Sequence, residues 1–177
     1  APGIMKGDVL DFGAFHGHLM GLAPPDYYEE KNRKWRLDTL PIIPDKFVYL
    51  PTDEESVNAL LAKIRSGGYD FIVNACDAGR EGEHIFYSFY EANGLTLPVR
   101  RYWASDFTEK SIKAALENLM DPKKKEGLRE ASKLRAELDW LTGMNFTRAV
   151  SLVGGAKVNV GRVMSIVLKF VVDRENE

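Results

Sequence analysis

Short apolar runs alternate with amphipathic segments through the middle of the chain, and this alternation constrains the fold most. Three runs are rich in β-branched and aromatic residues, as strands are, and they cover residues 47–50, 69–75 and 99–103. Three other segments repeat apolar residues at helical spacing, and they cover residues 54–65, 81–93 and 108–120. We therefore predict an α/β fold with a parallel sheet flanked by helices.

The pattern changes after residue 122. Residues 123–153 show no strand signal and predict one or two long helices, and a last helix is expected at 162–174. The apolar face of that last helix is expected to be core, and it comprises Val163, Ile166, Val167, Phe170 and Val171. We predict an α/β domain at 1–122 and a helical segment at 123–177.

Composition excludes several classes of protein. The chain has 177 residues, of which 45% are hydrophobic and 28% charged, so a folded core is expected rather than disorder. The best candidate for a membrane span, residues 165–172, is short and contains Lys169. One cysteine, Cys76, excludes an internal disulfide framework and fits a reducing compartment. We expect a soluble, cytoplasmic monomer with no membrane partner.

The net charge of −2 hides a difference between the two halves of the chain. Residues 1–98 carry 9 Lys and Arg against 15 Asp and Glu, whereas residues 99–177 carry 15 against 11. An acidic half joined to a basic half suits a metal site beside a polyanion-binding surface. Chance variation of surface charge explains the difference equally well.

An acidic cluster follows the apolar strand of residues 69–75. Ligands gather outside the carboxyl ends of parallel strands, and two carboxylates there suit Mg²⁺, which keeps several waters. Asp77 and Glu81 are the predicted metal ligands, and Arg80 between them can bind a phosphate. The alternative is structural, because acidic residues in a first helical turn stabilise the positive end of the helix.

The cluster DAGREGE resembles the acidic signature of the Toprim domain in type IA DNA topoisomerases, particularly the topoisomerase III-like branch. Asp77 and Glu81 match the first and third acids of that pattern, and Gly79 takes the place of the second. Further matching stretches lie on both sides of the cluster and keep the family's order. They are 17–19, 25–28, 35–44, 135–149 and 160–163. The resemblance therefore covers most of the chain.

This resemblance implies a topoisomerase fragment. Domain 1–122 would be a Toprim domain without its first strand, and 123–177 the helical part of the adjoining single-strand DNA-binding domain. The family's opening catalytic Glu has no counterpart, and its nucleophilic tyrosine lies beyond residue 177. The intact enzyme would carry out Mg²⁺-dependent single-strand DNA cleavage, strand passage and religation, so we expect the isolated chain to be inactive.

The basic half supplies the predicted DNA contacts. Arg135 and Asp139 are neighbours on one helix face, and we interpret Asp139 as aiming the arginine at a phosphate. Arg162 follows Gly161 at a helix start, where free backbone N–H groups also attract anions. The full predicted DNA-binding set is Arg80, Arg135, Asp139, Asn145, Arg148 and Arg162. Among these, Arg135 and Arg162 are assigned to catalysis together with Glu81.

Two other functions stay open at this point. Another Toprim enzyme, a primase or nuclease, would share the acidic cluster but should lack the runs at 139–148 and 161–163. A non-catalytic nucleic-acid-binding module would lack Asp77-dependent Mg²⁺ binding. A zinc site built from His16, His18, His84 and Cys76 is disfavoured because these residues lack paired ligand spacing.

Overall fold

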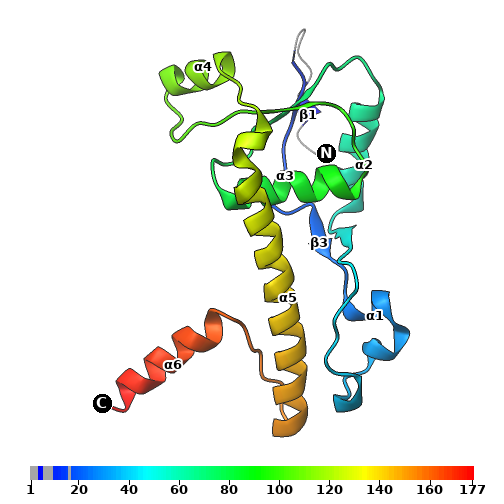
Figure 1. Ribbon diagram of the computed structural model, residues 1–177, viewed down its shortest axis with the longest axis vertical. Coiled ribbons are helices and arrows are strands. Elements are labelled where there is room, and N and C mark those ends of the chain that lie inside the picture. Colours follow the sequence, from blue (N-terminus) through cyan, green and yellow to red (C-terminus); the bar gives the residue numbers. More distant parts are fainter. Residues whose placement is uncertain (1–3, 6–9, 16) are drawn as a thin grey trace. The chain divides into compact units, whose positions relative to one another are not determined.

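The computed structural model describes residues 4–5, 10–15 and 17–177, and Figure 1 shows its helices and strands. The chain forms two compact units. Unit 1 comprises Ala1–Gly21 and Tyr49–Lys133, and unit 2 comprises Leu22–Val48 and Leu134–Glu177. His16 lies outside the described residues, so the structure gives no position for this predicted zinc ligand.

The strands are short and pair two by two. β5 (Ile72–Asn74) is parallel to β6 (Val99–Arg101), and Asn74 lies opposite Arg101 in this pair. The other two pairs are β1 with β2 (Ile4–Met5 and Phe12–Gly13, antiparallel) and β3 with β4 (Met20–Leu22 and Tyr49–Pro51). The predicted parallel pairing is confirmed for β5 and β6, and the acidic cluster follows the end of β5.

Two helices of unit 1 begin directly after a residue whose side chain caps them. α2 (Glu54–Arg65) is capped by Asp53, whose carboxylate accepts from Ser56 N at 3.2 Å. α4 (Glu109–Glu117) is capped by Thr108, whose hydroxyl accepts from the Ser111 amide. α3 (Arg80–Ala92) directly follows the acidic cluster, and a 3-10 turn, η3, covers Pro122–Lys125.

The core of unit 1 lies between β3 and helices α2 and α3. Its fully buried members are Leu19, Met20, Val57, Leu60, Leu61 and Phe89. In Figure 1 the green helix α3 and the adjacent α2 can be followed beside β3. Strands and helices share one core, so the predicted α/β class is confirmed.

Unit 2 is mainly helical. It contains short turns at α1 (Pro25–Tyr28), η1 (Glu30–Arg33) and η2 (Leu37–Thr39), followed by most of α5 (Glu126–Gly154) and by α6 (Met164–Glu175). Trp140 on α5 donates its indole N–H to Ala23 O at 3.1 Å and meets the rings of Tyr28 and Phe47 edge-on. This tryptophan is a packing residue within the unit.

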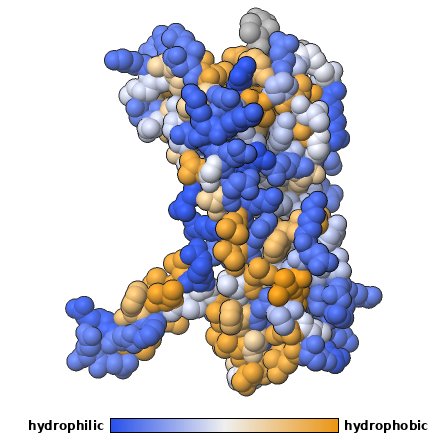
Figure 2. All heavy atoms as spheres, in the orientation of Figure 1, coloured by the Kyte–Doolittle hydropathy of each residue, from blue (hydrophilic) through white to orange (hydrophobic). Residues whose placement is uncertain are grey.

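The prediction for the apolar face of the last helix is wrong. Phe170 is 67% exposed, and the other four members of that face are exposed as well. Figure 2 shows hydrophobic atoms at the surface of α6, which is red in Figure 1. Helical periodicity shows which apolar residues share a face, but not whether another element packs against it.

The two units do not follow the order of the two predicted domains. Residues 22–48 group with the C-terminal part of the chain, and α5 runs through residue 133, where the units divide. A domain boundary near residue 122 stays a prediction. No helix within the described residues is both long and apolar enough to cross a bilayer.

Candidate metal and DNA-binding sites

The acidic cluster begins where β5 ends. The side chain of Asn74, the last residue of β5, accepts a hydrogen bond from Cys76 N at 3.1 Å and so turns the chain away from the strand. Asp77 follows and is exposed, and α3 begins at Arg80 after Gly79. Because the strand ends before the cluster, the Asp77 side chain lies at the carboxyl end of the parallel pair.

The first turn of α3 packs closely against the backbone of Asp77. A Cβ atom at Gly82 would lie 2.1 Å from the Asp77 carbonyl oxygen and 2.8 Å from its nitrogen. Only glycine fits at this position, so the second glycine of DAGREGE is explained by a close backbone approach. This contact sets Asp77 next to the helix turn that carries Glu81.

The three carboxylates of the cluster have different surroundings. Asp77 and Glu81 are exposed, whereas the Glu83 side chain is 1% exposed. Glu83 Oε1 accepts a hydrogen bond from Arg101 Nε at 2.6 Å, and the Arg101 side chain is also 1% exposed. A buried charge requires such a partner. Two carboxylates therefore face solvent, and the third holds an arginine.

Arg101 was not among the residues that the sequence singled out. It is preceded by the exposed Arg100 on β6, and the alternation of side chains along a strand turns Arg101 inward. An arginine on the buried face of a strand needs an acidic partner, and Glu83 was the one acid of the cluster without a predicted role. These two signals together could have identified the pair.

Glu81 is bonded to a histidine from a distant part of the chain. His18 Nε2 lies 2.5 Å from Glu81 Oε1, and the His18 carbonyl accepts from the Thr52 hydroxyl at 2.6 Å. Gly17, with φ of 76°, forms the turn before this histidine. The ring of His84 lies beside His18, and burial lowers the pKa of His84. One oxygen of Glu81 is therefore occupied by an imidazole.

The residues present fit a largely hydrated Mg²⁺ and do not form a closed cage. Across the described part of the chain, no three His, Cys, Asp or Glu side chains are grouped to hold a metal ion. Mg²⁺ commonly binds through one or two carboxylates and retains water at its other positions. Asp77 and Glu81 supply this minimal set. Burial also raises the pKa of Cys76 to about 11, which disfavours the thiolate that zinc would need.

Three of the predicted DNA-binding residues come together in unit 2. Arg162 Nε donates to Asp139 Oδ1 at 2.6 Å, and Arg135 Nε lies 3.6 Å from Asp139 Oδ2. All three side chains are between 42% and 49% exposed. The hydrogen bond from Arg162 lowers the pKa of Asp139, and the same contact raises the pKa of Arg162. The cluster has two guanidinium groups and one carboxylate, so it carries a net positive charge.

Asn145 and Arg148 form hydrogen bonds within unit 2. The Asn145 side chain accepts from Ile42 N at 2.6 Å and donates to Ile42 O at 2.9 Å. Arg148 is 4% exposed, and its guanidinium donates to Asn32 O at 2.7 Å. These contacts hold the segment of residues 22–48 on α5. The roles of Asn145 and Arg148 in DNA binding remain predictions. Arg80, also in the predicted DNA-binding set, is exposed at the start of α3.

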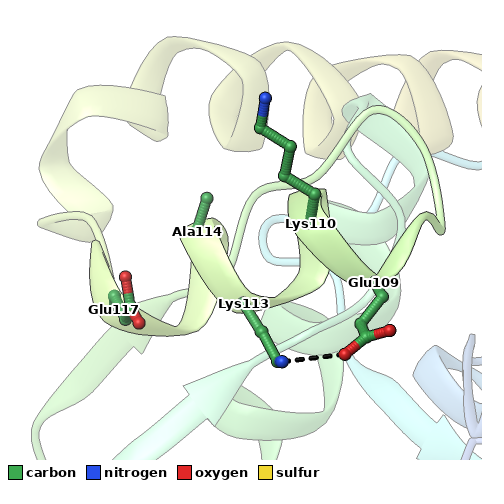
Figure 3. Close-up of a pocket in the computed structure, with 5 residues that line it drawn as sticks. All are labelled: Glu109, Lys110, Lys113, Ala114 and Glu117. Carbon is green, nitrogen blue, oxygen red and sulfur yellow. Dashed lines mark ion pairs between the residues drawn. The ribbon is translucent and has the colours of Figure 1, made fainter.

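A surface pocket elsewhere in unit 1 shares no lining residue with the acidic cluster. Figure 3 shows that all of its lining side chains come from α4, where Lys113 forms an ion pair with Glu109 at 2.7 Å. Neighbouring residues on one helix commonly form such pairs. Its charged side chains are ordinary surface residues of a single helix, so we do not take this pocket as the candidate site.

Comparisons with known proteins find relatives among the DNA topoisomerases. The chain is 35% identical over 175 residues to DNA topoisomerase 3 of Bacillus subtilis (strain 168), and this match covers 98% of the chain and 24% of the relative. It is 36% identical over 177 residues to DNA topoisomerase 3 of Bacillus licheniformis, covering 99% of the chain and 24% of the relative. A family model described as DNA topoisomerase matches residues 123–177. Together these matches support a topoisomerase III-like piece of a DNA topoisomerase.

The resemblance that the motifs predicted is therefore confirmed along almost the whole chain. The chain spans about a quarter of the length of these topoisomerase relatives. The match to the topoisomerase family model covers the part of the chain that carries Arg135, Asp139 and Arg162. The acidic cluster lies within the stretch shared with the full-length relatives.

Proposed function

We propose that this chain supplies the Mg²⁺ site and part of the DNA-binding surface of a type IA, topoisomerase III-like enzyme. The intact enzyme would cleave one DNA strand in a Mg²⁺-dependent reaction, pass another strand through the break and reseal it. One observation carries the proposal: Asp77 and Glu81 are exposed at the carboxyl end of a parallel strand pair, while Glu83 is withdrawn into a buried ion pair.

The metal part of the proposal assigns Asp77 and Glu81 as ligands. When bound, Mg²⁺ would neutralise phosphate charge at the DNA backbone. The two carboxylates would hold the ion while leaving positions for water and phosphate oxygens. Arg80, between them in sequence and exposed, would contact the same phosphate through its guanidinium. His18 would keep one Glu81 oxygen in place, which leaves the other oxygen for the ion.

The DNA part of the proposal assigns Arg135 and Arg162 as phosphate contacts. Asp139 holds the Arg162 guanidinium, so that group loses less conformational freedom when it binds an anion. The remaining N–H groups of the two arginines suit the oxygens of a phosphate. Contacts of this kind position a strand without reading its bases. We propose single-stranded DNA as the ligand of this cluster.

The test uses a protein that extends this chain to the length of its relatives. Relaxation of a negatively supercoiled plasmid in Mg²⁺ should be lost in Asp77→Asn and retained in Asp70→Asn, an exposed acid that lies before β5. The 177-residue chain itself should form no covalent adduct with an internally labelled single-stranded oligonucleotide on a denaturing gel. An adduct, or full activity of Asp77→Asn, would overturn the proposal.

A further inference from the structure

The Arg101 guanidinium forms hydrogen bonds with the backbone that leads into the acidic cluster. Its Nη1 donates to the carbonyl oxygens of Asn74 at 2.9 Å and Cys76 at 2.6 Å. Its Nη2 donates to the carbonyl oxygen of Asp77 at 2.6 Å. Three carbonyl groups, from the last residue of β5 and from the turn after it, therefore point at one cation. A further bond from Nη1 to Tyr102 O, at 2.5 Å, ties the group to its own strand.

The orientation of this guanidinium is itself fixed from the opposite side. Glu83, in the first turns of α3, accepts from Arg101 Nε at 2.6 Å. The guanidinium also lies over the ring of Trp103, with Arg101 Cζ 4.8 Å from the ring centroid. Arg101 thus connects three parts of unit 1, which are strand β6, helix α3 and the turn that carries Asp77.

We propose that Arg101 is a positioning residue for the metal site, because it fixes the turn from which the Asp77 side chain projects. This inference rests on the proposed function of Asp77 as a Mg²⁺ ligand. Arg101 touches neither the ion nor DNA. It acts through its hydrogen bond to the backbone carbonyl of Asp77, against which Gly82 also packs closely. A ligand whose backbone is held in this way needs little ordering when the ion binds.

The conservative variant Arg101→Lys separates positioning from charge balance. Lysine keeps a positive charge beside Glu83, but its compact ammonium group cannot reach the glutamate and several carbonyl groups at once. A second variant, Glu83→Gln with Arg101→Met, removes both charges and so avoids a buried charge without a partner. Leu60→Ala is the matched control, because Leu60 belongs to the buried core cluster of unit 1, which includes no residue of the turn at 75–79.

Cys76 provides a readout that needs no metal. It is the single cysteine of the chain, it lies in the turn, and its carbonyl is one of the groups that Arg101 holds. Alkylation of Cys76 by iodoacetamide should be at least about fivefold faster in Arg101→Lys than in the parent, because opening of the turn exposes the thiol. Leu60→Ala, measured well below its melting temperature, should react like the parent.

The metal readout is a Mg²⁺ titration followed by amide NMR of the 177-residue chain. We expect the Mg²⁺ dissociation constant to rise about tenfold in Arg101→Lys and in the double variant, and to stay unchanged in Leu60→Ala. Asp77-dependent Mg²⁺ binding that is equally tight in Arg101→Lys and the parent would overturn the positioning role alone. Mg²⁺ binding that does not depend on Asp77 would overturn the metal site, and faster Cys76 alkylation would still show that Arg101 orders the turn.

Discussion

Asp139 binds Arg162 through both carboxylate oxygens, with Arg162 Nε 2.6 Å from Oδ1 and Nη2 3.4 Å from Oδ2. The two residues are 23 positions apart, with Asp139 in α5 and Arg162 in the segment between α5 and α6. A bidentate contact fixes the plane of the guanidinium, which an exposed arginine otherwise samples freely. Arg162 is therefore a partly exposed cation with a fixed orientation among the predicted DNA contacts.

Replacing Arg162 by alanine should weaken the binding of single-stranded DNA. We expect a loss of about 1 kcal/mol, or roughly fivefold in affinity, because the lost contact is exposed. The slope of log affinity against log salt should fall by about 0.7. Base preference should not change, because a phosphate contact carries no sequence information. Fluorescence anisotropy with labelled oligonucleotides of different sequence, at several salt concentrations, measures all three.

The control for this experiment is Lys124→Ala. Lys124 is an exposed lysine in η3, and its neighbour Lys125 instead lies over the ring of Trp103. Removing Lys124 should change affinity little. The assignment of Arg162 as a DNA contact would be wrong if Lys124→Ala weakened DNA binding while Arg162→Ala bound DNA like the parent.

The pair of Asp139 and Arg162 also predicts a pH dependence. The hydrogen bond from Arg162 lowers the pKa of Asp139, so the folded state favours the ionised carboxylate. The stabilisation from this pair is therefore fully present above the ordinary aspartate pKa and is lost as pH falls through the lowered pKa. Carbon-detected NMR should give Asp139 a pKa below its ordinary value, and Arg162→Ala should raise it. An unchanged pKa in Arg162→Ala would show that the contact is absent in solution.

Gly82→Ala should disturb the acidic cluster, although the substitution adds only one methyl group. The added Cβ would lie 2.1 Å from the carbonyl oxygen of Asp77, so the helix and the turn must move apart. Overpacking of this kind costs about 1–3 kcal/mol. Gly127→Ala is the matched control, because a Cβ at this position in α5 meets no atom within 4 Å and alanine favours helix. Urea unfolding should show a loss for Gly82→Ala alone, and equal stability of the two variants would contradict the packing.

Gly79→Asp should strengthen the metal site. Gly79 takes the place of the second acid in the Toprim pattern, its φ of 176° is open to any residue, and a Cβ there would meet no atom within 4 Å. A third carboxylate raises the charge of the ligand set, so we expect Mg²⁺ to bind on the order of tenfold more tightly. Asn58→Asp adds the same charge at an exposed position of α2 in the same unit and should have little effect on affinity. The loss of affinity in Gly79→Asp would place the ion elsewhere.

Local patterns predicted the elements of unit 1 well. The start of α2 follows from Asp53 as its cap, and its end at Arg65 follows from the glycines after it. The exposure of Asp77 and Glu81 at a strand end likewise follows from the order of a short apolar run and an amphipathic helix. Such signals lie within a few neighbouring residues, so a single sequence contains them.

Contacts between distant residues were not predictable in this way. The pairing of Glu83 with Arg101 depends on which residues are buried, and a sequence lists three similar carboxylates without showing that difference. The bond of Asn145 to Ile42 joins residues 103 positions apart, so the sequence does not show that this amide holds a loop. The exposed face of α6 shows the same limit, because periodicity does not identify a packing partner.

The most direct test of the metal site is a Mg²⁺ titration of the 177-residue chain followed residue by residue with amide NMR. With two carboxylates as ligands we expect a dissociation constant on the order of millimolar, about −4 kcal/mol, with the largest shifts between Asp77 and Glu81. Asp77→Asn and Glu81→Gln should abolish these shifts, and Asp70→Asn should leave them unchanged. Shifts of the same size and midpoint in Asp77→Asn would contradict the assignment of the acidic cluster as the metal site.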